Sequence, residues 1–144
     1  MGLSDVSQIS LLVVARVVSA NDDYIIIDAG SKVLSSDKGA HGSAGAEGYG
    51  LASWGKMNSP MVIEKLSEEH GWCRRPAPEK GAPKINDLVT VLPNHSCPVA
   101  NLGAHYVVFD GDIDDFFKCT TGADIWPIQA ADCSHAEPPI SLLE

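Results

Sequence analysis

The sequence predicts an all-β fold, either an antiparallel β sandwich or a partly open barrel, with long loops and few short helices. Short runs rich in β-branched and apolar residues follow one another, separated by turn-forming residues. No window of about 11 residues repeats its apolar positions with a helical period, which argues against long helices. The expected strands are residues 11–18, 24–28, 61–64, 88–92, 105–110 and 125–128.

The first two expected strands are predicted to form a hairpin. Residues 11–18 (LLVVARVV) and 24–28 (YIIID) enclose the segment 19–23, whose Ser, Asn and Asp residues are typical of turns. Asn86 and Asp87 provide similar turn chemistry before the strand at 88–92. The sequence therefore predicts short strands that are joined by turns.

Two segments are expected to form long surface loops. Residues 39–50 contain five glycines with Ala and Ser between them, and residues 74–84 are rich in Pro, Gly and charge. Loops of this length within a compact domain are more often functional or disordered than neutral. The chain is expected to be a single domain over residues 1–144, with a core at about 11–132 and loosely ordered ends at 1–8 and 133–144.

Charge and composition exclude several classes of protein. The 144 residues include 19 Asp and Glu against 10 Lys and Arg, which gives a net charge of -9. Nucleic-acid binding needs clustered cations, so no nucleic-acid partner is expected. The apolar stretch 11–20 is shorter than the ~20 residues that span a bilayer, and no basic residue precedes it. Four cysteines are too sparse for a disulfide framework, so a cytoplasmic protein with reduced thiols is expected.

The strongest candidate for a chemical role is the pair His95 and Cys97, directly after the expected strand at 88–92. If extended geometry continues through this segment, both side chains project to the same side. An imidazole nitrogen and a thiolate both suit Zn²⁺. The alternative is a strand end with one partly buried histidine and one buried thiol, because two ligands do not complete a metal site.

Other polar residues have plainer interpretations. Glu68 and His70 lie in the segment SEEHG and offer further ligands, although a polar turn is the preferred interpretation. Lys32 is expected to be a solvated or structural lysine rather than a Schiff-base lysine. No phosphate-binding loop and no GxSxG segment occurs. Ordinary surface or half-buried histidines are expected at His41, His105 and His135.

The sequence contains, in this order, the phrases VVS (17–19), IDAGSK (27–32), LSSD (34–37), LSEEHG (66–71), VLPNHSCP (91–98) and WPI (126–128). Together these phrases resemble the C-terminal β domain of the eukaryotic-type D-serine dehydratases and the related D-threonine aldolases. The resemblance extends over about residues 11–132. The phrases with PNHxC and SEEHG are the most specific of these.

In that family, an N-terminal alanine-racemase-like barrel holds pyridoxal phosphate on a lysine, and the β domain brings a divalent metal to the substrate hydroxyl. The resemblance therefore implies Zn²⁺ on His95 and Cys97, with positions left open for water or substrate. Glu68 and His70 are possible additional ligands. Open positions suit a Lewis acid, whereas a structural zinc has four protein ligands.

The sequence also departs from the family pattern. A cofactor barrel usually takes about 250 residues, so pyridoxal phosphate is not expected on this chain alone. Where the family continues with an Arg-Gly phrase after WPI, this sequence has residues 129–132 (QAAD). The end of the last expected strand is therefore predicted to differ.

Three functions are consistent with the sequence. The first is a free-standing metal-binding β domain that is not catalytic by itself. The second is a subunit of a pyridoxal-phosphate- and metal-dependent lyase for a D-β-hydroxy amino acid, completed by a separate barrel chain. The third is a non-catalytic ligand or protein interaction module with a decayed metal site. In each case a face that normally packs on a barrel must be covered, so a homodimer or a larger assembly is expected.

Overall fold

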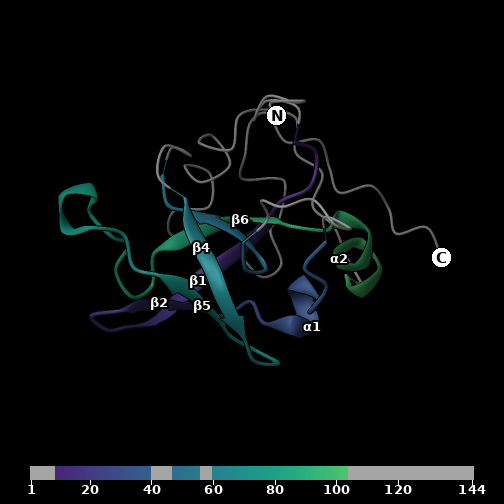
Figure 1. The fold of residues 1–144 in the computed structure, drawn as a ribbon, viewed down its shortest axis with the longest axis horizontal. Helices are drawn as coiled ribbons and strands as arrows, with labels where there is room; N and C mark the ends of the chain where they lie inside the picture. Colours follow the sequence, from purple (N-terminus) through teal and green to yellow (C-terminus); the bar gives the residue numbers. More distant parts are fainter. Residues whose placement is uncertain (1–8, 40–46, 56–59, 104–144) are drawn as a thin grey trace, which may run out of the picture. The chain divides into compact units, whose positions relative to one another are not determined.

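In the computed structural model, the described residues are 9–39, 47–55 and 60–103, and they form a closed six-stranded antiparallel barrel (Figure 1). Around the barrel the strands follow the order β1-β2-β5-β4-β3-β6, and β6 pairs with β1 to close it. The prediction of an all-β fold is confirmed, and the barrel is fully closed. The strands are β1 (Val13–Ala20), β2 (Tyr24–Ile27), β3 (Gly50–Ser53), β4 (Met61–Leu66), β5 (Gly71–Arg74) and β6 (Leu88–Pro93).

Two strands close the barrel by changing partners along their length. Residues 13–16 of β1 pair with β6, whereas its later residues pair with β2, and the register shifts between Val17 and Ser19. Strand β4 pairs first with β3 and then with β5, with a register shift between Ile63 and Lys65. Such irregularities bend a strand and increase its twist. They let the sheet curve back on itself.

Alternating apolar side chains fill the barrel. In β1, Ala15 and Val17 are buried, and in β6, Val89 and Val91 are buried, each pair two residues apart. Side chains two apart in a strand point to the same face, which here is the interior. The sequence signal for both strands was their run of β-branched and apolar residues. The other members of the buried core are Ile25, Ile27, Ala29, Leu34, Ala52, Met61, Ile63 and Cys73.

Four expected strands correspond to observed ones, and two observed strands were not predicted. Strands β1, β2, β4 and β6 match the expected runs. Strands β3 and β5 have four residues each and begin with glycine, so their sequences carry little strand signal. Each lies between two other strands of the barrel, and this pairing holds it in the sheet. The expected strands at 105–110 and 125–128 lie outside the described residues.

The turns and loops agree in part with expectation. The side-chain Oδ1 of Asn21 accepts hydrogen bonds from the backbone N–H groups of Asp23 and Tyr24, at 2.9 and 2.8 Å. This local capping confirms the predicted turn of the first hairpin. The expected loop at 39–50 ends in strand β3, which begins at Gly50. The expected loop at 74–84 contains one short 3-10 helix, η2 (Pro78–Lys80).

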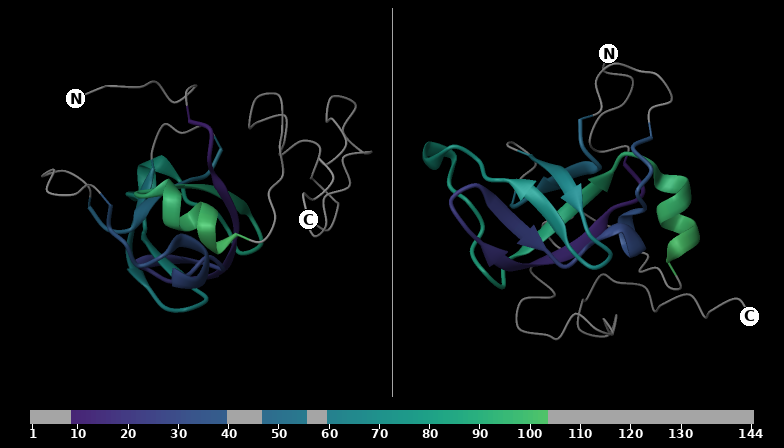
Figure 2. Two further views of the ribbon diagram at one scale, coloured as in Figure 1. Left: turned by 90° about the vertical axis from the view of Figure 1, so that its right-hand side faces the viewer. Right: turned by 60° about the horizontal axis from the view of Figure 1, so that its bottom comes forward.

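Two short α-helices, α1 (Ser31–Leu34) and α2 (Ser96–Leu102), pack against each other at one end of the barrel (Figure 2). The prediction of few, short helices is confirmed for the described residues. Neither of them has the length or apolar character needed to cross a membrane. Helix α1 follows strand β2, and helix α2 follows strand β6. The ends of two strands are thereby brought together at this end of the barrel.

The turn between β4 and β5 is packed directly on the start of α1. The N–H of Ser31 donates to the carbonyl of Ser67 at 2.8 Å, and the N–H of Lys32 donates to the carbonyl of Glu68 at 3.1 Å. A Cβ atom at Gly30 would lie 2.4 Å from the Glu68 carbonyl oxygen. Only glycine allows so close an approach. The segments DAGSK and SEEHG therefore pack against each other through their backbones.

Replacing Gly30 with alanine is expected to destabilise the barrel by about 1–3 kcal/mol, the usual cost of overpacking a close contact. The reason is the 2.4 Å separation of the added Cβ from backbone that cannot easily move. The measurement is the free energy of unfolding in urea. Gly55→Ala measures the cost of backbone strain alone, because Gly55 has a positive φ of 65° but nothing within 4 Å of an added Cβ. An unchanged free energy of unfolding in Gly30→Ala would contradict the contact.

Candidate metal centre

His95 and Cys97 have different backbone conformations, because they lie on either side of the boundary between the segment after β6 and helix α2. His95 is extended, with φ -139° and ψ 107°, whereas helix α2 begins at Ser96 and contains Cys97. The expectation that extended geometry reaches Cys97 is therefore wrong. Pro98 lies in the first turn of the helix, where its missing N–H is not needed. The argument that residues two apart in a strand point to the same side therefore does not apply to His95 and Cys97. Binding of one metal by both side chains stays a prediction.

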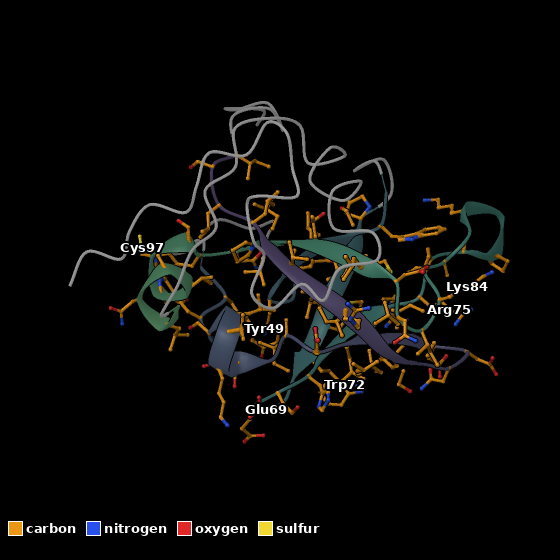
Figure 3. The ribbon with its side chains drawn as sticks, turned by 180° about the vertical axis from the view of Figure 1, so that it is seen from behind. Tyr49, Glu69, Trp72, Arg75, Lys84 and Cys97 are labelled. Carbon is orange, nitrogen blue, oxygen red and sulfur yellow. The ribbon has the colours of Figure 1, made fainter. Side chains whose placement is uncertain are left out.

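The two candidate ligands differ in exposure. Cys97 is exposed and forms no disulfide, and Figure 3 places it on α2, away from Arg75 and Lys84 toward the other end of the barrel. The side chain of His95 is 30% exposed. The alternative of a buried thiol at this position does not hold. The thiol is accessible to a ligand in solution.

Asp37 is the residue that the structure adds to this region. Its Oδ2 lies 2.8 Å from Nδ1 of His95, and its Oδ1 accepts a hydrogen bond from the N–H of Gly39 at 2.8 Å. Sequence reasoning did not assign Asp37 a role, although it closes the LSSD phrase. The contact joins residues 58 positions apart, and no local pattern reveals it. A carboxylate on one ring nitrogen is the arrangement that commonly orients a metal-ligating histidine.

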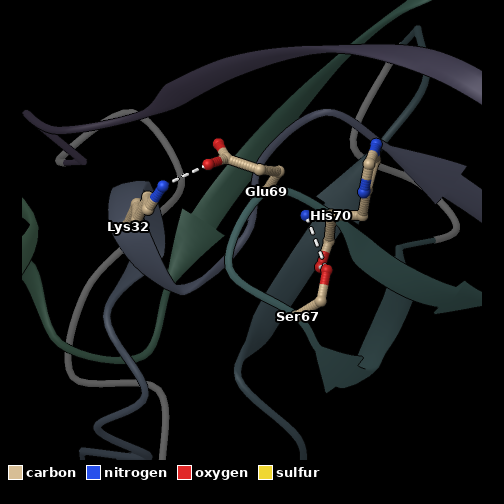
Figure 4. Close-up of polar contacts among 4 residues, drawn as sticks. All are labelled: Lys32, Ser67, Glu69 and His70. Atoms are coloured by element: carbon tan, nitrogen blue, oxygen red, sulfur yellow. Dashed lines mark hydrogen bonds and ion pairs between the residues drawn. The ribbon is translucent and has the colours of Figure 1, made fainter.

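The segment SEEHG forms the turn between β4 and β5, so the interpretation as a polar turn is confirmed (Figure 4). The N–H of Ser67 donates to the His70 carbonyl at 2.9 Å, and the N–H of His70 donates to the Ser67 hydroxyl at 3.1 Å. The His70 ring meets Trp72 edge-on, at 6.5 Å between ring centroids. Glu68 and His70 are both exposed.

Further metal ligands are not assembled in the described part of the chain. Within residues 9–39, 47–55 and 60–103, no three His, Cys, Asp or Glu side chains gather into a group that could hold a metal. Ligation by Glu68 or His70 stays a prediction. The remaining three histidines, at 41, 105 and 135, lie outside the described residues.

Lys32 has a structural role at the surface, as expected. Its Nζ forms an ion pair with Glu69, and both side chains are more than half exposed (Figure 4). The hydrogen bond that Lys32 donates to Glu69 raises the pKa of Lys32. The lysine therefore stays charged at neutral pH.

The architecture defines the class of the protein as a small closed antiparallel barrel whose candidate site lies at the end that carries the two helices. Comparison with protein families identifies the class more closely. The model of the family described as "Putative serine dehydratase domain" matches residues 10–109. The chain belongs to this family.

Relatives in two mycobacteria resemble the chain over most of its length. Uncharacterised proteins of Mycobacterium tuberculosis and Mycobacterium bovis are each 30% identical to it over 136 residues. The alignment covers 90% of this chain and 89% of each relative. The matched segment thus makes up nearly all of those proteins.

Solved structures share the fold as one part of longer chains. An alanine racemase-like protein from Idiomarina loihiensis is 27% identical, with a TM-score of 0.64 over 74% of this chain. D-threo-3-hydroxyaspartate dehydratase from Delftia sp. HT23 is 22% identical, with a TM-score of 0.61 over 75% of this chain. The match covers only 30% and 31% of those two chains, so this chain spans about a third of their length.

The two described cysteines are expected to differ sharply in reactivity. Burial raises the pKa of the Cys73 thiol to about 12, so it carries almost no thiolate at pH 8. Cys97 is exposed and should react with iodoacetamide under native conditions. Peptide mass spectrometry after brief labelling measures both, and labelling in denaturant is the control. Labelling of Cys73 as fast as Cys97 in the native protein would contradict the structure.

Proposed function

We propose that this chain is a serine dehydratase-like domain that binds a divalent metal, preferentially Zn²⁺, through His95 and Cys97, and that it is not catalytic by itself. The observation that carries the proposal is the hydrogen-bonded contact between His95 Nδ1 and Asp37, together with the exposed thiol of Cys97 two residues further along the chain. A cytoplasmic, reducing compartment suits a metal site with a thiol ligand.

The residues fit such a metal in their chemistry. Imidazole nitrogen and thiolate sulfur are both common ligands of Zn²⁺. With two protein ligands, the remaining positions would be open to water or to a small oxygen-bearing ligand. A metal bound in this way supplies a Lewis acid that polarises a hydroxyl or carbonyl oxygen.

Variants of a solved dehydratase support the ligand pair. Two structures of D-threo-3-hydroxyaspartate dehydratase carry a histidine-to-alanine and a cysteine-to-alanine substitution, at positions two residues apart. The cysteine variant is described as the metal-free form. His95 and Cys97 have the same spacing and order.

The lack of independent catalysis is inferred from the size of the matched segment. The solved relatives are about three times as long as the segment they share with this chain. Pyridoxal phosphate chemistry requires a cofactor lysine and a surrounding electron-sink environment, which the family resemblance assigns to the other part of those chains. The mycobacterial relatives, 89% of which align with this chain, have room for little besides the domain.

Purified protein without an affinity tag is expected to bind one Zn²⁺, and His95→Ala or Cys97→Ala should weaken binding by about 100-fold or more, beyond the loss typical of an outer-shell partner. A competition titration against a chelating dye measures the affinity. Glu69→Gln is the matched surface control, because Glu69 forms an exposed ion pair with Lys32.

The variants Glu68→Gln and His70→Ala decide whether the β4–β5 turn supplies further ligands. A loss of affinity in either variant would add that residue to the ligand set. If wild-type protein binds no Zn²⁺, or if His95→Ala binds it as tightly as wild type, the interaction module with a decayed site becomes the better account.

A second candidate function is that of a subunit in a lyase for a D-β-hydroxy amino acid, completed by a separate barrel chain. The observation in its favour is that Val33 on α1 and Leu102 on α2 are 39% and 48% exposed, at the end of the barrel that carries the site. A partner chain could cover them. Copurification with a barrel chain that shows aldimine absorbance would support this function, and a purified protein without such a partner would count against it.

We also propose that, without a barrel chain, these apolar residues are covered in a homodimer. Exposed apolar residues on adjoining helices favour association, because their burial removes apolar surface from water. Light scattering should then give about 30 kDa, twice the 15.2 kDa of one chain. Leu102→Glu should shift the mass toward the monomer, whereas Ile85→Glu, which changes an exposed residue outside both helices, should not. A monomer at high concentration would refute the dimer.

A further inference from the structure

We propose that Asp37 is the positioning residue of the metal site: its carboxylate fixes the ring of His95 so that Nε2, and not Nδ1, is the nitrogen that binds the metal. This inference rests on the proposed function. Its basis is the 2.8 Å contact between Asp37 Oδ2 and His95 Nδ1. The role of Asp37 is thus assigned by geometry that connects two distant parts of the chain.

The direction of the hydrogen bond follows from the chemistry of the two groups. An ionised carboxylate can only accept hydrogen bonds, so Nδ1 of a neutral His95 must carry the hydrogen that points to Asp37. Nε2 then keeps its lone pair in the ring plane. A metal needs a nitrogen with such a lone pair, and the hydrogen bond at the other nitrogen decides which one has it.

Asp37 is itself held in place by its local backbone. Its own N–H donates to the hydroxyl of Ser35 at 3.1 Å, and its Oδ1 accepts from the N–H of Gly39 at 2.8 Å. The first hydrogen bond fixes the backbone at Asp37, and the second restricts its side chain. The Oδ2 atom is therefore directed to His95 by a preorganised turn rather than by a freely rotating surface carboxylate.

The turn that carries Asp37 is also packed against the end of β6. Gly39 has a φ of 62°, and a Cβ atom there would lie 2.6 Å from the carbonyl oxygen of Asn94. It would also lie 3.3 Å from the Cβ atom of His95. Backbone contact thus brings the segment after α1 against the residue that precedes His95. The spacing between Asp37 and His95 is a consequence of the fold.

Stability alone gives little reason for this contact. The side chains of His95 and Asp37 are 30% and 41% exposed, and partly exposed ion pairs contribute little to folding. Removing the partner of a metal-ligating histidine, by contrast, typically costs 10–100-fold in metal affinity. The effect of Asp37 should therefore appear in metal binding far more than in the melting temperature.

The test compares wild type, Asp37→Asn and the control Glu69→Gln. Asparagine keeps the size of the side chain and can still accept from Gly39, but its amide N–H₂ would then face Nδ1 of His95 and favour the opposite tautomer. In a competition titration with Zn²⁺, Asp37→Asn should bind about 10–100-fold more weakly than wild type. Glu69→Gln should match wild type, because its carboxylate pairs with Lys32 instead.

A second measurement reports on the ring directly and needs no metal. The ¹⁵N chemical shifts of the imidazole in metal-free protein distinguish a hydrogen on Nδ1 from one on Nε2. The Nδ1–H tautomer is expected in wild type and in Glu69→Gln, and its population should fall in Asp37→Asn. Melting temperatures within a few degrees of wild type would show that the variants fold.

The outcomes separate the two proposals. If wild type binds Zn²⁺ and Asp37→Asn keeps both the affinity and the tautomer, the role of Asp37 is overturned while the proposed function stands. If wild type binds no Zn²⁺, the proposed function fails, and the tautomer measurement alone then decides whether Asp37 sets the ring of His95. An unchanged tautomer in that case overturns the positioning role as well.

Discussion

The pairing of β1 with β6 is the interaction on which the rest of the structure depends. It joins Val13 to Val91 and continues to Arg16 and Leu88, and it turns an open sheet into a closed barrel. Closure leaves no free strand edge among the described strands. Strand β6 is also held on its other side by β3, so its end at Pro93 has a fixed position. His95 follows directly, and its placement is set by the barrel.

A second contact connects the segment that carries Asp37 to the barrel. The backbone at Gly30 is packed on the β4–β5 turn, and helix α1 starts there. The segment after α1 then reaches the end of β6 through Gly39, which carries Asp37 to His95. Much of what is distinctive in the sequence phrases DAGSK, LSSD and SEEHG is therefore explained by backbone packing. The proposed metal binding depends on fewer side chains, chiefly those of Asp37, His95 and Cys97.

The sequence predicts the parts of this structure that depend on local patterns. Runs of β-branched and apolar residues identified β1 and β6, whereas β3 and β5 depend on pairing with their neighbours and have no strong pattern of their own. His95 was found from its place after a strand. The helix at Cys97 was missed because Pro98 reads equally well as the end of an extended segment or as part of a first helical turn. Asp37 was missed because its partner is 58 residues away.

Locating the metal itself tests the account most directly. Crystals of the zinc-loaded protein, measured on both sides of the zinc absorption edge, would show the metal as an anomalous difference peak. We expect a peak about 2.0–2.1 Å from Nε2 of His95 and about 2.3 Å from Sγ of Cys97, with Asp37 still hydrogen-bonded to Nδ1. A peak on Nδ1, or a metal bound away from His95, would contradict it.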